Sequence, residues 1–156
     1  MIYRVIIRNL LATAGLLLLS ACGSTPFGDG ITDLTLKITV AGDANPDDSG
    51  RASPVFLSVF ELRDTGTFEH TEYLDLYRDA RAALGGGLID SSEIGPLFPD
   101  STRTEQLRLN TNTNAVGLMG GFNRYSEMNT TVTLELEPGK DRTVNILIDR
   151  SGIHLD

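Results

Sequence analysis

Apolar and polar residues alternate strictly in the segment from Asp33 to Val40. Because successive side chains of a β-strand point to opposite faces, the apolar residues of this segment would share one buried face. Similar alternation predicts strands over 55–62, 106–109, 131–136 and 142–148. Two further candidate strands are 152–155 and 115–122. The glycines of 115–122 suggest a bulge or a close backbone approach. Six or seven strands with one polar face each favour an all-β fold in which two sheets pack as a sandwich.

One helix is predicted over residues 68–84, where the period of two gives way to apolar residues spaced three and four apart. Thr67 or Thr71 could cap its start, and the three glycines at 85–87 would end it. The fold class expected from the pattern is therefore all-β with a helical addition, packed on or beside the sandwich.

Two segments lack a regular pattern. Residues 42–54 are polar, rich in turn-forming residues and without an apolar side chain larger than alanine, so they predict a long exposed loop between the first two strands. Residues 93–104 contain Pro96 and Pro99, which are expected to prevent a regular element.

The N-terminus has the pattern of an export signal. Arg4 and Arg8 precede an apolar run at 10–19 that is too short to span a bilayer. The run ends in Leu19-Ser20-Ala21-Cys22, the order of a branched apolar residue, two small residues and a thiol that a lipoprotein signal peptidase requires. We expect residues 1–21 to be a lipoprotein signal peptide and Cys22 to receive the lipid. The alternative is an ordinary signal peptide in which this cysteine is incidental.

The mature chain would begin with a flexible tether at 22–30, followed by one domain at 31–156. Cys22 is the only cysteine, so the domain has to fold without disulfides. Gly23 stands where an aspartate would commonly retain a lipoprotein in the inner membrane, which favours the outer membrane, facing the periplasm. Loss of two arginines with the signal changes the net charge from −8 to −10. This acidity argues against nucleic acid and anionic lipid surfaces as partners, so membrane contact is expected through the lipid alone.

The sequence offers little for catalysis or cofactor binding. His70 and His154 each lack a nearby ligand at metal-binding spacing, and the common hydrolase, metalloprotease and phosphate-loop motifs are absent. Asp75 and Asp79 lie four residues apart and could in principle pair as acid and base, but such pairs more often form a solvated helix surface. We therefore expect no enzyme activity and no cofactor.

Asp43, Asn45 and Asp47 imitate the first ligands of a calcium loop. Asp48 then occupies the position where that loop needs glycine, and Pro54 occupies the position of its bidentate glutamate. A solvated turn is the preferred interpretation, with no metal bound.

The order of these parts resembles the TssJ (VasD/Lip) family of type VI secretion outer-membrane lipoproteins. The resemblance includes the lipidation motif at Cys22, the passage from Asn45-Pro46-Asp47 through Gly50-Arg51 to Ser53-Pro54-Val55, Phe68 with the helical 73–77 segment, and Val116-Gly117-Leu118 to Phe122. It departs from commoner members at Ala52, where proline is frequent, and at Gly120-Gly121, where alanines are usual.

This resemblance implies a transthyretin-like sandwich and a structural role, in which the protein docks the periplasmic C-terminal domain of the inner-membrane protein TssM, with TssL in the same membrane complex. It also implies that the loop between the first two strands makes the contact. The candidate residues there are Asp43, Asn45, Pro46, Asp47, Asp48, Ser49, Gly50 and Arg51. The alternative is a periplasm-facing lipoprotein that binds a small ligand or carbohydrate, although the chain has no tryptophan and its tyrosines lie mostly in or near the helix.

Overall fold

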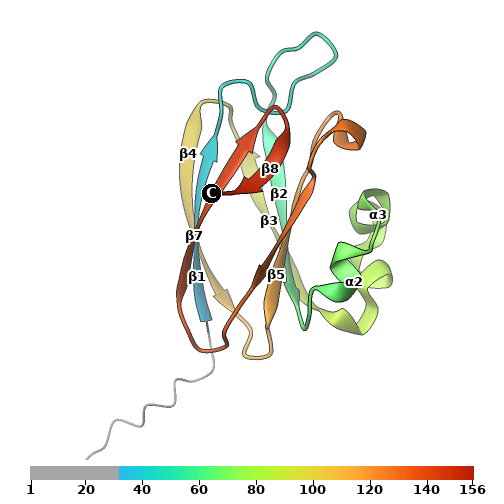
Figure 1. Ribbon diagram of the computed structural model, residues 1–156, viewed down its shortest axis with the longest axis vertical. Helices are drawn as coiled ribbons and strands as arrows, with labels where there is room; N and C mark the ends of the chain where they lie inside the picture. The colour runs from blue at the N-terminus through green and yellow to red at the C-terminus, as the bar shows by residue number, and fades with distance from the viewer. Residues whose placement is uncertain (1–31) are drawn as a thin grey trace, which may run out of the picture.

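The computed structural model describes residues 32–156, in which two β-sheets face each other and helices lie to one side (Figure 1). The strands are β1 (Thr32–Val40), β2 (Val55–Leu62), β3 (Leu88–Leu97), β4 (Ser101–Leu109), β5 (Ala115–Gly120), β6 (Thr131–Glu135), β7 (Arg142–Asp149) and β8 (Gly152–Leu155). The helical elements are α2 (Gly66–Glu69), α3 (Tyr73–Leu84) and the 3-10 turns η1 (Gly85–Gly87) and η2 (Tyr125–Glu127). Over this part of the chain the sheets have the orders β4-β1-β7-β8 and β3-β2-β5-β6. The predicted two-sheet sandwich with a helical addition is confirmed.

Strand β1 is central in its sheet, antiparallel to β4 and parallel to β7. The face predicted from its alternation is confirmed, since its four alternate apolar residues from Leu34 to Val40 are each at most 2% exposed. They belong to the same core cluster as Leu57 of β2 and Leu118 of β5 in the opposite sheet. Because burial of one such side chain stabilises by about 1.5–3 kcal/mol, this layer between the sheets is the main source of stability.

A second apolar cluster covers the outer face of the β3-β2-β5-β6 sheet, where Phe68 of α2 and Leu76 of α3 pack with Phe60 of β2. Gly117 of β5 makes room for them, because a Cβ there would lie 2.7 Å from the Phe68 ring. The close approach predicted from the β5 glycines is thus confirmed. Since the core covers one face of β5 and the helices the other, all of its residues are buried and its sequence does not alternate.

The prediction that residues 93–104 form no regular element is wrong, because β3 and β4 include most of them. Strand β3 lies at a sheet edge, where a proline can be accommodated without breaking the ladder of a central strand. Its pairing with β2 is irregular at this point and skips Gly95 and Pro96. Pro99 lies in the turn between β3 and β4.

Strand β4 begins at Ser101, earlier than the predicted 106, because it pairs with β1 along its whole length. It is also an edge strand, and Arg103 and Glu105 lie opposite the core-facing residues of β1, where they form an ion pair. Inward-facing charges discourage an edge strand from pairing with another chain. These polar residues at core-facing positions conceal the strand from a hydrophobicity pattern.

The single helix predicted over 68–84 is divided into α2 and α3. In the break, His70 Nδ1 lies 2.8 Å from the carbonyl oxygen of Gly66, and the Thr71 hydroxyl donates to the carbonyl oxygen of Thr67 at 2.6 Å. Side chains that bond nearby carbonyls in this way compete with continued helical hydrogen bonding. Polar residues between the two apolar faces therefore interrupt the helix.

The predicted capping is correct at one end of the helical region only. The N-cap positions are Thr65 and Glu72, and neither side chain makes a capping hydrogen bond, so the proposal of Thr67 or Thr71 is wrong. At the other end Gly85 stops α3 with φ of +53°, a conformation that favours glycine. Within residues 32–156, no helix is long and apolar enough to cross a membrane.

Candidate partner-binding loop

The predicted partner-binding residues lie together at one end of the sandwich, in the connection from β1 to β2 (Figure 1). Thr32, where the described chain begins, lies at the other end. Because a strand rises about 3.3 Å per residue, the nine residues of β1 separate the two ends by roughly 26 Å. The predicted lipidation site, Cys22, falls outside the described residues.

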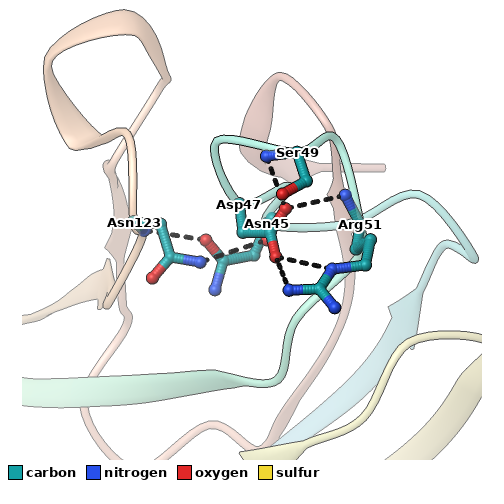
Figure 2. A network of polar contacts seen from close by, with 5 residues as sticks. All are labelled: Asn45, Asp47, Ser49, Arg51 and Asn123. Carbon is teal, nitrogen blue, oxygen red and sulfur yellow. Dashed lines mark hydrogen bonds and ion pairs between the residues drawn. The ribbon is translucent and has the colours of Figure 1, made fainter.

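The base of this loop is buried, which corrects the expectation of a loop exposed throughout. Ala44, Asn45 and Pro46 are all buried. Asn45, only 2% exposed, donates from Nδ2 to the carbonyl oxygen of Pro54 at 2.9 Å, and its Oδ1 accepts from the backbone amide of Asn123 at 2.8 Å. Figure 2 shows these two asparagines facing each other, with Asn123 Nδ2 also 3.4 Å from the carbonyl oxygen of Asn45. The amide side chain therefore fastens the loop to a distant segment.

The backbone of Asn45 has φ of +48°. Few residues other than glycine adopt this left-handed region, and asparagine is one of those that do so most readily. Position 45 thus needs both the conformational tolerance and the side-chain amide of asparagine.

Asp47 organises the tip of the loop through both carboxylate oxygens (Figure 2). Its Oδ1 accepts from the backbone amides of Ser49 at 2.8 Å and Arg51 at 3.0 Å. Its Oδ2 accepts from the Arg51 side chain, with Nε at 3.0 Å and NH2 at 2.9 Å. Gly50, with φ of +79°, completes the turn by donating its amide to the Asp47 carbonyl oxygen at 2.8 Å. The tip is a closed turn that presents Asp48, Ser49 and the Arg51 side chain to solvent.

We expect the order of this tip to depend on pH. The backbone amide of Arg51 holds the pKa of Asp47 below its ordinary 3.8, and the Arg51 side chain and the Ser49 amide act in the same direction. A lowered pKa means that the carboxylate stabilises the tip above pH 3.8 and that this contribution is lost as pH falls through the lower folded value. Amide protection factors at Ser49 and Arg51, measured by NMR relative to β1, should be constant above pH 3.8 and fall as the pH is lowered below it. Asp47→Asn should remove that dependence, and protection that persists unchanged to pH 2 would contradict the assignment.

In two of the three residues that imitate a calcium loop, the side-chain oxygens already accept hydrogen bonds within the protein. Asn45 Oδ1 accepts from Asn123, and both oxygens of Asp47 accept from the turn itself. In the described part of the chain, no three His, Cys, Asp or Glu residues are grouped so that they could hold a metal ion.

One constellation that sequence reasoning did not single out lies in the turn between β7 and β8. Ser151 Oγ donates to Asp149 Oδ1 at 2.6 Å and lies 2.9 Å from His154 Nε2, which is 3.3 Å from the same carboxylate oxygen. In a Ser-His-Asp triad the acid and the serine contact opposite ring nitrogens, whereas here both face Nε2. This arrangement closes a turn and does not prepare a nucleophile.

The Asp79 carboxylate of α3 is also occupied by local structure. Asp79 has non-helical φ and ψ of −158° and 81°, and its Oδ1 accepts from the backbone amide of Ala82 at 3.0 Å. Asp75 and Asp79 are both exposed, as is His70. Their position favours a solvated helix surface over an acid-base pair.

Sequence reasoning missed Asn123, the residue that holds the loop base. It lies 78 positions from Asn45, and no local motif indicates that the two meet. Only the fold, which brings the segment between β5 and η2 beside the loop, reveals the contact.

Solved structures share this fold. TssJ1 from Pseudomonas aeruginosa superposes with a TM-score of 0.75 and 22% identity, over 80% of this chain and 95% of that chain. Lip from Serratia marcescens, described as a membrane-bound component of the type VI secretion system, gives 0.73 and 19%, over 80% and 95%. A chain in the structure described as "T6SS protein TssM C-terminal domain (869-1107) from EAEC" gives 0.63 and 20%, over 80% and 97%. No curated protein sequence matches this chain.

At the level of sequence, residues 32–151 match the family described as "Type VI secretion lipoprotein, VasD, EvfM, TssJ". The match begins at the first residue of β1 and extends through β7 into the turn before β8, so it includes every strand except β8, together with the helices and the loop. The chain belongs to the type VI secretion lipoprotein family.

Proposed function

We propose that this protein is a structural lipoprotein of the outer membrane, attached through Cys22 and facing the periplasm, that docks the periplasmic C-terminal domain of TssM through residues 43–51. TssL would belong to the same membrane complex through the inner-membrane protein TssM. The protein holds two membranes together in this role and catalyses no reaction.

The observation that carries the proposal is that the loop is ordered by contacts within the protein itself. Its base is buried and its tip is closed by Asp47, so a partner meets a surface that is already ordered. Preorganised loops lose little conformational freedom when they bind, and that cost otherwise reduces affinity. The tip displays both charges of an ion pair, which suits a polar interface selected by complementarity.

The position of the loop supports the same role. An anchor at Cys22 enters the fold through Thr32, and the loop lies at the opposite end of β1 (Figure 1). The start of β1 is held by the turn before β7, because Thr32 Oγ1 accepts from the amide of Gly139 at 3.0 Å and the amide of Asp33 donates to Asp141 at 3.1 Å. With hydrogen-bonded neighbours on both sides, β1 is suited to transmit force between anchor and loop.

One similar structure supports the choice of partner. The structure described as the TssM C-terminal domain contains a chain that shares this fold, with a TM-score of 0.63. We take this as support for a TssM contact in the present protein.

A binding measurement tests the docking role. The full-length protein, purified from membranes in detergent, would be titrated with the TssM periplasmic domain. A triple change at the tip, Asp48→Ala, Ser49→Ala and Arg51→Ala, should weaken binding at least about tenfold, because exposed polar groups at the centre of an interface are lost.

The matched control lies at the other end of the sandwich. Glu137 and Lys140 form an exposed ion pair in the turn between β6 and β7, which resembles the Asp47 and Arg51 pair in kind. A Glu137→Ala, Lys140→Ala double change should leave the affinity unaltered. Equal affinities for the wild-type protein and the tip variant would refute the loop as the docking site.

A further inference from the structure

A groove lined by aromatic rings runs beside the loop, and neither the sequence pattern nor the proposed docking site includes it. Its volume is about 590 Å³. Phe56 of β2, Tyr73 and Tyr77 of α3, Phe122, and Tyr125 of η2 contribute the rings, and we call this site the aromatic groove. Phe56 is 46% exposed, Tyr77 68% and Tyr125 37%. Large exposed apolar side chains that gather in one place commonly mark an interaction site.

The tyrosines of the groove are already arranged in a stack. The ring centroids of Tyr73 and Tyr125 are 4.7 Å apart with an interplanar angle of 13°, and those of Tyr73 and Tyr77 are 6.1 Å apart at 15°. The stack connects α3 to the 3-10 turn η2. A ligand would therefore meet side chains whose rotamer freedom is already restricted, which lowers the entropic cost of binding.

The groove is continuous with the base of the loop. Asn123, which lines it, is the residue hydrogen-bonded to Asn45, and the amide of Gly121 donates to the carbonyl oxygen of Phe56 at 2.8 Å. Phe56 itself follows the end of the loop by two residues. A partner seated on the loop thus has the groove within reach of its next segment.

The charge of the groove is negative. Among the described residues that line it, Glu93 is the one with a charged side chain. Burial raises the pKa of Tyr73 above its ordinary 10.0, so its hydroxyl is uncharged at neutral pH. A ligand that suits this site combines an apolar group for the rings with a positive charge for the carboxylate.

We propose that the aromatic groove is a second contact for the partner that docks on the loop, and that it receives an extended segment carrying an apolar or aromatic residue next to a lysine or arginine. This inference rests on the proposed function. It adds an apolar anchor to a docking surface whose loop is almost entirely polar. Buried aromatic contacts of this kind usually contribute most of the affinity of an interface, while polar surroundings give specificity.

A glycan fits the groove less well than a peptide segment. Sugars stack on open ring faces, but Tyr73 is already stacked with Tyr77 and with Tyr125. Sugar hydroxyls also require several hydrogen-bonding groups, and the amide nitrogen of Asn123 is already directed at Asn45. The groove offers aromatic rings and one carboxylate, a surface that favours an apolar side chain with a basic neighbour.

The test uses the detergent-purified full-length protein and the TssM periplasmic domain. Tyr77→Ala and Phe56→Ala should each weaken binding about tenfold, as loss of a central aromatic anchor does. Glu93→Gln should weaken it about threefold at low salt and have no effect at high salt, because the interaction is one of screened charges. Leu155→Ala serves as the matched control, since Leu155 is an exposed apolar residue of the other sheet, and it should bind like the wild type. Thermal unfolding would be recorded for each variant to show that it is folded. If Phe56→Ala proves to be destabilised, the binding result for Tyr77→Ala decides the test.

A photo-crosslinking amino acid in place of Tyr77 identifies the occupant in cells. A crosslink to TssM is the expected result. Crosslinks only to lipid or to a second copy of the chain, displacement by soluble cell-wall glycan fragments, or wild-type affinity of Tyr77→Ala would each overturn the inference. If the tip variant binds weakly while the groove variants bind normally, the groove inference fails and the loop proposal stands. If the wild-type protein does not bind the TssM domain, the proposed function itself fails.

Discussion

Replacing Gly152 with alanine is expected to reduce the free energy of unfolding by about 3–5 kcal/mol, the sum of backbone strain and lost hydrogen bonds. Gly152 has φ of +125°, and a Cβ at this position would lie 2.0 Å from the carbonyl oxygen of Asn129 and 2.7 Å from its backbone nitrogen. That backbone cannot move aside easily, because the Asn129 amide donates to the Ser151 carbonyl and the Ile153 amide donates to the Asn129 carbonyl, both at 2.8 Å. The contact joins β8 of one sheet to the segment before β6 of the other, so its loss would loosen the sandwich as a whole.

Urea denaturation of the variant and of Gly86→Ala would test this expectation. Gly86 is the matched control, since a Cβ there meets nothing within 4 Å. Its replacement should change the free energy of unfolding by less than about 0.5 kcal/mol, as is usual for surface substitutions. Coincident denaturation midpoints for the two variants would show that the backbone at 152 can relax.

Alternation is clearest in strands of which one face meets the core and the other meets water. Strands β1 and β7 meet this condition, and alternation identifies both. Strand β5 does not, because Phe68 and its neighbours cover its second face. Strand β4 differs in the opposite sense, since Arg103 stands opposite the buried Ile38, and only pairing with β1 reveals the part of the strand before residue 106. A one-dimensional pattern records burial, but not which neighbour causes it.

The candidate site could be predicted from the sequence to a similar extent. The position of the loop and its turn-forming residues could be inferred from sequence and resemblance. The burial of Asn45 could not, because the residues that cover it come from another part of the chain. The aromatic groove was hidden for the same reason: Phe56, Tyr73 and Tyr125 come from three elements, and nothing in their spacing indicates that their rings meet. Local chemistry can be inferred from local sequence, whereas surfaces assembled from distant segments require the fold.

Cys22→Ser is expected to abolish type VI secretion while leaving the affinity for the TssM periplasmic domain unchanged. The described fold begins at Thr32, and the loop and the aromatic groove are formed by residues after it, so loss of a lipid at Cys22 removes no contact of either site. A lipid anchor holds a protein to a membrane through about 0.8 kcal/mol per buried methylene, and a protein without the lipid loses this attachment. The docked partner would then be bound to a domain that has no attachment to the outer membrane. Effector release would be measured in cells, and binding with the purified variant. Full secretion by Cys22→Ser would refute a tethering role.

A second variant separates the effect of lipidation from the effect of the membrane in which the protein is retained. Gly23→Asp keeps Cys22, the proposed acylation site, but supplies the residue that commonly retains a lipoprotein in the inner membrane. If the protein acts as a fixed point on the outer membrane, this variant should be lipidated, should bind TssM and should still fail to support secretion, because anchor and partner then belong to one membrane. Secretion that survives Gly23→Asp but not Cys22→Ser would mean that any membrane attachment suffices. The separation between Thr32 and the loop, along the length of β1, would then have no role in connecting two membranes.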